Sequence, residues 1–106
     1  NNSNFSDEVT KLGLKVGEEV WNMPVDNSYE KDINSDLADM KNVGSGRGAG
    51  STAGAIVLKR FIKDTTWMHL DIAGVTWAKS DRPMTPKGGS GFGVRLLDEL
   101  VFKNFE

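Results

Sequence analysis

Trp67-Met68-His69-Leu70-Asp71-Ile72-Ala73-Gly74 is the stretch of sequence that decides the fold. Successive side chains of a strand point to opposite faces, and here both faces carry bulky residues. A strand with bulky residues on both sides is typical of the centre of a sheet that helices cover on each side. The stretch therefore predicts a central strand over residues 67–73 and an α/β fold.

Two segments before this strand have the apolar periodicity of helices. Ser6 is expected to cap the first helix, and the second helix is expected to begin near Asp26 or Asn27. The apolar positions are Val9, Leu12, Val16 and Val20 in the first helix, and Tyr29, Ile33, Leu37 and Met40 in the second.

Two further helices flank the strand. Residues 52–62 are nearly all apolar, which predicts a helix that is buried on most sides. Residues 74–90 contain two prolines and two adjacent glycines, and they predict a long loop. The last helix is expected over residues 92–104. Its apolar side consists of Val94, Leu97, Val101 and Phe105.

A single strand among four helices does not make a sheet. Its backbone donors and acceptors would stay unpaired along both edges. We therefore expect residues 67–73 to pair with strands that lie outside these residues, either in another chain or in the remainder of the same protein.

The composition is that of a globular domain. The 106 residues are 38% hydrophobic and 26% charged, with a formal net charge of -2. This charge gives no electrostatic case for nucleic acid or an anionic membrane as a partner, and no apolar run approaches the roughly 20 residues needed to span a bilayer. The absence of cysteine excludes disulfides and thiolate metal sites, and it fits a cytoplasmic protein.

Two loop motifs suggest ligand sites, but their details argue against this. Residues 44–51 are glycine-rich and lead into a helix, yet they lack the Walker lysine and no strand is expected before them, so a flexible connection is favoured over a nucleotide site. Residues 32–36 have the oxygen spacing of a calcium loop. Leu37 and Val43 stand where that loop needs Gly and Glu, so we interpret the match as chance.

Four charged or titratable residues remain as candidates. His69 and Asp71 lie two apart on one face of the strand, a spacing that suits a metal or a base with its orienting partner. The favoured interpretation is a buried polar pair that is hydrogen-bonded to neighbouring loops. Arg47 and Arg95, in or beside the glycine-rich segments, are able to meet anions, although surface salt bridges are the favoured role.

Ala73-Gly74-Val75-Thr76 follows the carboxyl end of the predicted strand. Ligands of open α/β sheets bind in the crevice beyond this end. Small residues there leave room for a ligand, and close packing against another element explains them equally well.

Four stretches together resemble the C-terminal end of the leucyl aminopeptidases, also called cytosol aminopeptidases. They are Gly17-Glu18-Glu19-Val20-Trp21 with Met23-Pro24, residues 34–42, residues 67–74 and residues 91–97. The combination is specific and extends over nearly the whole chain. It implies that residues 1–106 are the C-terminal fragment of a catalytic domain, and that this domain is a three-layer α/β/α sandwich.

The chemistry that the resemblance implies belongs to a longer protein. Members of the family assemble as hexamers and remove N-terminal residues, often Leu, from peptides with the help of two divalent metal ions, zinc, manganese or magnesium. Their metal ligands are a Lys and several Asp and Glu residues, some of them in an Asn-Thr-Asp-Ala-Glu-Gly-Arg segment that also supplies a catalytic Arg. These 106 residues contain no such segment, so no metal ligand and no catalytic residue is assigned here.

Part of the substrate pocket does carry over from the family. Its members line the pocket for the substrate's first side chain with the Ala of Asp-Ile-Ala-Gly, here Ala73, and with the residue three further on, here Thr76. Some members have Met at the second position, which leaves the side-chain preference open.

The resemblance therefore predicts a cytoplasmic, Leu-preferring aminopeptidase as the full-length protein. We expect peptide substrates, the remainder of the same catalytic domain and further copies in a homohexamer as its partners, and neither nucleic acid nor membrane. This fragment alone is expected to be inactive and to bind no metal. The alternative is a non-catalytic, stand-alone interaction module of the same fold.

Overall fold

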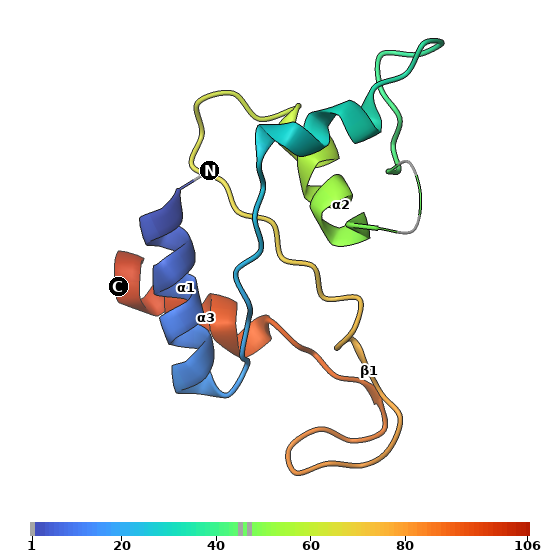
Figure 1. Cartoon of the computed structure of the whole chain (residues 1–106). Coiled ribbons are helices and arrows are strands. Elements are labelled where there is room, and N and C mark those ends of the chain that lie inside the picture. The colour runs from blue at the N-terminus through green and yellow to red at the C-terminus, as the bar shows by residue number, and fades with distance from the viewer. Residues whose placement is uncertain (1, 45, 47) are drawn as a thin grey trace. The chain divides into compact units, whose positions relative to one another are not determined.

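The computed structural model describes residues 2–44, 46 and 48–106. In chain order its elements are α1 (Ser3–Val16), the 3-10 helix η1 (Asn27–Ile33), α2 (Gly50–Lys59), β1 (Trp77–Ala78), β2 (Gly88–Gly89) and α3 (Val94–Phe105) (Figure 1). The chain divides into two compact units. The first unit contains η1 and α2 within residues 23–69, and the second contains the other elements within residues 3–22 and 70–106.

The second unit is built on α1, which packs against α3 (Figure 1). Val9 and Leu12 of α1 and Leu96 of α3 are buried, which confirms part of the apolar face predicted for the first helix. The prediction that Ser6 caps this helix is wrong, because α1 begins at Ser3. The Ser6 hydroxyl instead donates to the side chain of Asn22, beyond the end of the helix.

Two ion pairs join α1 to α3. Lys103 Nζ lies 2.8 Å from Glu8 Oε1, and Lys15 of α1 pairs with Glu99 of α3. The hydrogen bond from Lys103, followed by one from Asn104, lowers the pKa of the Glu8 carboxyl. One pair links the last turn of α1 to α3, and the other links the last turn of α3 to α1. The C-terminal end of each helix is therefore held against the other helix.

The end of α1 depends on two glycines. Gly17 has a φ of +70°, its N–H donates to the carbonyl oxygen of Leu14 at 3.4 Å, and the N–H of Glu18 donates to the carbonyl oxygen of Gly13 at 2.9 Å. This pair of bonds is the Schellman motif. A Cβ on Gly13 would lie 2.5 Å from the carbonyl oxygen of Glu18. Two residues of low helix propensity thus allow the tight reversal that positions Glu18.

Glu18 is only 3% exposed, and its carboxylate lies at the N-terminus of α3. Its Oε2 accepts hydrogen bonds from the N–H groups of Gly93 (3.1 Å) and Leu96 (2.9 Å), and its Oε1 accepts from Nε of Arg95 (3.3 Å). Gly93 is the N-cap residue and has no side chain to accept from the first N–H groups of α3, so the Glu18 carboxylate accepts from them in its place. Its negative charge also interacts favourably with the positive end of the helix dipole. Arg95 thus pairs with a buried carboxylate, whereas Arg47 lies outside the described residues.

The first unit consists of η1 packed against α2. Ile33 of η1 and Ile56 of α2 are fully buried. The helix predicted over residues 52–62 is confirmed as Gly50–Lys59. The expectation that it is buried on most sides is wrong, because Leu58 is 46% exposed and Phe61, just past its end, is exposed as well.

The second predicted helix begins where the sequence indicates. Asp26 is the N-cap of η1, and one of its carboxylate oxygens accepts a hydrogen bond from the N–H of Ser28 at 2.8 Å. Hydrogen bonds from the side chain and then the backbone of Ser28 lower the pKa of Asp26. The acidic cap therefore stays charged at the positive end of the short helix.

This helix ends earlier than its apolar stripe predicts. The backbone becomes extended at Asn34, and Oγ of Ser35 accepts hydrogen bonds from the N–H groups of Leu37 (3.2 Å) and Ala38 (3.1 Å). A serine side chain that takes up these donors competes with helical hydrogen bonding. The predicted continuation to Met40 is therefore wrong, and Leu37 is fully exposed.

The strand predicted over residues 67–73 is not formed within the described chain. Residues 67–72 have no regular secondary structure, and residues 73–75 form a turn. Both lie in the yellow-to-orange part of the ribbon in Figure 1. A strand exists through hydrogen bonds to a neighbouring strand. Among the described residues the only paired strands are β1 and β2, and neither includes residues 67–73. The expectation that strands from outside these residues pair with the segment stays a prediction.

The long loop predicted over residues 74–90 is instead a β-hairpin, in which β1 and β2 run antiparallel. Backbone hydrogen bonds of 2.9 and 3.0 Å between Arg82 and Thr85 close its tip, and the N–H of Lys87 donates to Oδ1 of Asp81 at 2.8 Å. The paired residues are Trp77 with Gly89 and Ala78 with Gly88. In the part of the chain that the structure covers, no helix has the length and apolar character to cross a membrane.

Gly13→Ala is expected to destabilise the second unit, because the new methyl group would lie 2.5 Å from a backbone oxygen of Glu18. The expected loss in the free energy of unfolding is about 1–3 kcal/mol, measured by urea titration of the chain with circular dichroism. Gly54→Ala is the matched control, since this helical glycine has no atom within 4 Å of the added methyl. It is expected to stabilise by about 0.5–1 kcal/mol. Equal effects of the two substitutions would contradict the packing argument.

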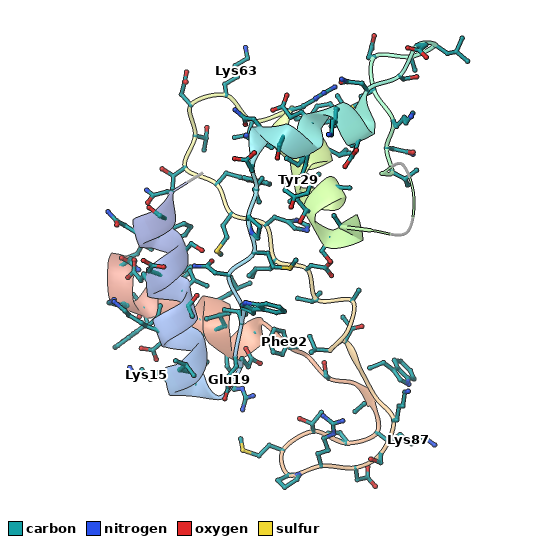
Figure 2. All side chains as sticks on the ribbon, in the orientation of Figure 1. Lys15, Glu19, Tyr29, Lys63, Lys87 and Phe92 are labelled. Carbon is teal, nitrogen blue, oxygen red and sulfur yellow. The ribbon has the colours of Figure 1, made fainter. Side chains whose placement is uncertain are left out.

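Glu18→Ala is expected to loosen the start of α3, because buried N–H groups lose a charged acceptor. The expected loss in the free energy of unfolding is about 2–3 kcal/mol, with faster amide hydrogen exchange at Gly93 and Leu96 measured by NMR. Glu19→Ala is the control, since this neighbouring carboxylate is exposed just beyond the turn that follows α1 (Figure 2). If both variants exchange at the wild-type rate, Glu18 does not hold the helix.

Candidate functional site

Ala73 and Thr76 lie in one turn between the irregular segment and the hairpin. The carbonyl oxygen of Ile72 accepts hydrogen bonds from the N–H groups of Val75 (3.0 Å) and Thr76 (3.2 Å). The N–H of Ala73 donates to Oδ1 of Asp71 at 3.1 Å. Both candidate side chains are small and exposed. The structure therefore brings the two predicted pocket residues into a single solvent-facing turn.

Ser90 joins this turn to the segment that leads into α3. Its Oγ donates to the carbonyl oxygen of Val75 at 2.6 Å, and its N–H donates to the carbonyl oxygen of Thr76 at 2.9 Å. The same Oγ accepts from the N–H of Phe92, which lies just before α3 (Figure 2), at 3.2 Å. No motif in the sequence marks Ser90 as a site residue. The sequence feature that could have identified Ser90 is its position two residues before the predicted start of a helix, where a serine hydroxyl is able to form a hydrogen bond with the backbone.

Glu18 is the second residue that sequence analysis does not assign to the site. Gly93, which donates to its carboxylate, follows Phe92 directly, so one run of hydrogen bonds leads from Glu18 through the start of α3 to Ser90 and the turn. The signal in the sequence is a helix that starts with glycine. Such a helix needs an acceptor from elsewhere in the chain for its first N–H groups.

The expectation that His69 and Asp71 are both buried is wrong, because His69 is half-buried and Asp71 is exposed. The His69 ring stacks on Trp67 with centroids 6.4 Å apart and an angle of 25° between the planes. The Asp71 carboxylate accepts a hydrogen bond from the N–H of Ala73 in the turn that follows. His69 belongs to the first unit and Asp71 to the second. Across residues 2–44, 46 and 48–106, no group of three or more His, Cys, Asp or Glu is arranged to hold a metal ion.

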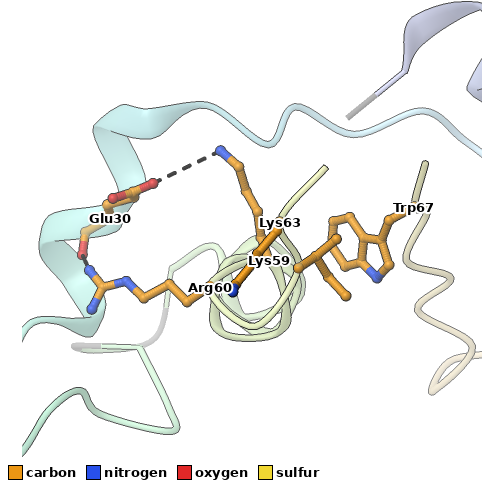
Figure 3. A pocket seen from close by; sticks show the side chains of 6 residues that line it. Glu30, Lys59, Arg60, Lys63 and Trp67 are labelled. Atoms are coloured by element: carbon orange, nitrogen blue, oxygen red, sulfur yellow. Dashed lines mark hydrogen bonds and ion pairs between the residues drawn. The ribbon is translucent and has the colours of Figure 1, made fainter. Parts of the chain in front are cut away.

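A pocket of about 220 Å³ lies in the first unit, beside the end of α2 (Figure 3). It is lined by Glu30, Lys59, Arg60, Ile62, Lys63 and Trp67. Arg60 already donates to Oδ1 of Asn34 (2.7 Å) and to the carbonyl oxygen of Glu30 (3.3 Å), and Lys59 donates to Oδ1 of Asn27 (2.7 Å). Because these cations are bonded to oxygens of η1 and the residue after it, they serve to join the helices of this unit.

Comparison with known proteins gives a family that covers nearly all of the chain. The family model described as "Cytosol aminopeptidase family, catalytic domain" matches residues 1–98. Two similar relatives, from Nitrobacter hamburgensis and from Rhizobium etli strain CFN 42, are both called "Probable cytosol aminopeptidase" and are 49% and 50% identical over 106 residues. Each alignment covers the whole chain and 21% of the relative, so the chain spans about a fifth of their length.

Two solved structures of aminopeptidases are similar to this chain over nearly its whole length. The cytosol aminopeptidase from Coxiella burnetii matches with a TM-score of 0.89 and 25% identity, over 99% of this chain and 23% of that one. A mutant of tomato leucine aminopeptidase matches with a TM-score of 0.82 and 39% identity, over 97% of this chain and 19% of that one. The helices and small sheet described above therefore form an α/β fragment of that fold.

Proposed function

This chain belongs to the cytosol aminopeptidase family, and from that premise we propose that it is the C-terminal part of a catalytic domain that releases N-terminal residues, Leu in particular, from peptides. The observation that carries the proposal is the alignment of the whole chain, at 49% identity, with a relative named as a cytosol aminopeptidase. Because the chain spans 21% of that relative, the activity is proposed for the longer protein.

The proposed task of this chain is to shape the pocket for the substrate's first side chain. The turn at residues 73–76 is exposed and carries only small or medium side chains. The methyl group of Ala73 leaves space beside it, and Thr76 offers a branched side chain with a methyl and a hydroxyl. An apolar substrate side chain gains binding energy from such a pocket according to how well it fills it.

The family resemblance implies two divalent metal ions, zinc, manganese or magnesium, which polarise the scissile carbonyl group and activate a water molecule. The residues of this chain do not fit the site of these ions, since its described part offers no cluster of acidic or histidine ligands. We propose that the ligands and the catalytic residues come from the remainder of the enzyme.

The proposed partner of this chain is that remainder of the catalytic domain. The apolar side of α3 is 46 to 82% exposed. It consists of Val94, Leu97, Val101 and Phe105. Contiguous apolar surface of this kind marks an interaction site, and the relatives supply a partner through the four-fifths of their length that this chain does not cover. The same remainder would supply strands to residues 67–73.

The full-length enzyme is proposed to act in the cytoplasm as a homohexamer, as the family resemblance implies. The alternative of a non-catalytic interaction module is not favoured, because relatives that match the chain from end to end are aminopeptidases by name.

The purified chain alone is expected to release no Leu from leucyl peptides, because it lacks a metal-ligand cluster in its described part. The full-length enzyme is expected to release Leu, and to lose this activity when a chelator removes its metal. Leu release with and without chelator, together with calorimetric titration of Zn²⁺ and Mn²⁺ into both proteins, measures the difference. A full-length enzyme without aminopeptidase activity would overturn the proposed function. Metal-dependent hydrolysis by the chain alone would show that its role extends beyond the pocket.

Ala73→Phe in the full-length enzyme is expected to lower kcat/KM for leucyl substrates by about 10–100-fold, because the phenyl group would occupy space meant for the substrate side chain. The loss for glycyl substrates is expected to be smaller, since glycine has no side chain to exclude. Overpacking costs about 1–3 kcal/mol of stability, so metal content and assembly are measured alongside. Ala73→Gly, which keeps the space open, is the control. Equal losses for leucyl and glycyl substrates in a correctly assembled variant would remove Ala73 from the pocket.

A further inference from the structure

We propose that Ser90 is a positioning residue that sets the preference of the enzyme for the first side chain of its substrate. The residue acts by fixing the backbone on both sides of Thr76. This inference rests on the proposed function, in which Thr76 lines the pocket, and it adds a residue that never touches the substrate itself.

The geometry of the turn gives Ser90 this role. The peptide group before the Cα of Thr76 contains the carbonyl of Val75, and the peptide group after it contains the carbonyl of Thr76. Ser90 donates to both of these oxygens, at 2.6 Å from its Oγ and at 2.9 Å from its N–H. Because peptide groups are planar, two held planes fix φ and ψ of the residue between them. They thereby fix the direction of the Thr76 side chain.

The orientation of the Ser90 hydroxyl is fixed in turn by the start of α3. Its Oγ accepts from the N–H of Phe92 at 3.2 Å. A hydroxyl has one proton, and with a lone pair occupied by Phe92 that proton is free to point to the carbonyl of Val75. The next residue, Gly93, is held by the buried carboxylate of Glu18. Hydrogen bonds therefore connect the turn, through Ser90 and the start of α3, to the packed helices α1 and α3.

The hairpin tip does not share this role. It is closed by its own contacts, among them the bond from the N–H of Lys87 to Asp81 at 2.8 Å. That contact is also a bond between a side chain and the backbone within the same hairpin, but it touches neither the turn at residues 73–76 nor the start of α3. Asp81 therefore provides a matched comparison for Ser90.

The test uses the full-length enzyme with Ser90→Ala, Ser90→Thr and Asp81→Ala, and compares kcat/KM for a leucyl and a glycyl dipeptide. Ser90→Ala is expected to lower the leucyl-to-glycyl ratio by about five-fold, the change that one ordinary hydrogen bond produces. Ser90→Thr keeps the hydroxyl and is expected to keep the ratio, and Asp81→Ala is expected to leave it unchanged. Amide hydrogen exchange by mass spectrometry is expected to rise in the peptide containing Phe92 only in Ser90→Ala.

A leucyl-to-glycyl ratio that stays at the wild-type value in Ser90→Ala, or falls equally in Asp81→Ala, would overturn the inference while leaving the proposed function intact. A wild-type enzyme that hydrolyses neither dipeptide would overturn the proposed function and the inference with it. If Ser90→Ala fails to assemble, Ser90→Cys decides the question. Its thiol is close in size to the hydroxyl but bonds weakly, so the ratio must again fall.

Discussion

The buried carboxylate of Glu18 is the interaction on which the second unit depends. A helix that begins after a glycine cannot satisfy its own first N–H groups with a cap side chain, and α3 begins in this way. The acceptor comes from 75 residues earlier in the chain, where the Schellman turn after α1 delivers it. Removing an acceptor from buried donors costs more than the bond itself is worth, since the donors stay out of water. The position of α3 on α1 is therefore fixed by polar as well as apolar contacts.

The same carboxylate explains how a solvent-exposed turn keeps a defined shape. Short loops with small side chains have little packing of their own and open locally at low free-energy cost. Here the loop carrying Ala73 and Thr76 is bonded to Ser90, and the residues after Ser90 are bonded to Glu18. The turn has no buried side chains of its own, and its conformation is therefore stabilised through the buried side chain of Glu18, which is distant in the sequence.

The sequence allows prediction of those elements whose determinants are local. The helix at Gly50–Lys59 follows from a nearly continuous apolar run, the last helix from apolar periodicity, and the start of η1 from Asp26. The early end of η1 does not, because Ser35 competes for donors that the apolar stripe assigns to a helix. The strand predicted over residues 67–73 is not formed, since an apolar pattern gives no strand without a neighbouring strand to pair with, and the described chain pairs none with these residues.

The site shows the same division between local and long-range determinants. Ala73 and Thr76 are recognisable because the motif around them is contiguous, and they do share a turn. Ser90 and Glu18 act through hydrogen bonds that span 15 and 75 residues, and no spacing rule links such positions. The last helix has two apolar sides, so its apolar periodicity alone does not show which side is buried within the unit. Leu96 is on the side that packs within the unit, whereas Val94 and Phe105 remain exposed.

The self-contained tip of the hairpin has a consequence for evolution and engineering. Its hydrogen bonds lie within residues 81–87 and include none to the turn at residues 73–76. Exposed loop tips of this kind accept insertions. We therefore expect variation in chain length to be accommodated at the tip, between Arg82 and Thr85, more readily than at the turn of residues 73–76, and the same place suits a grafted epitope or a fluorescent label.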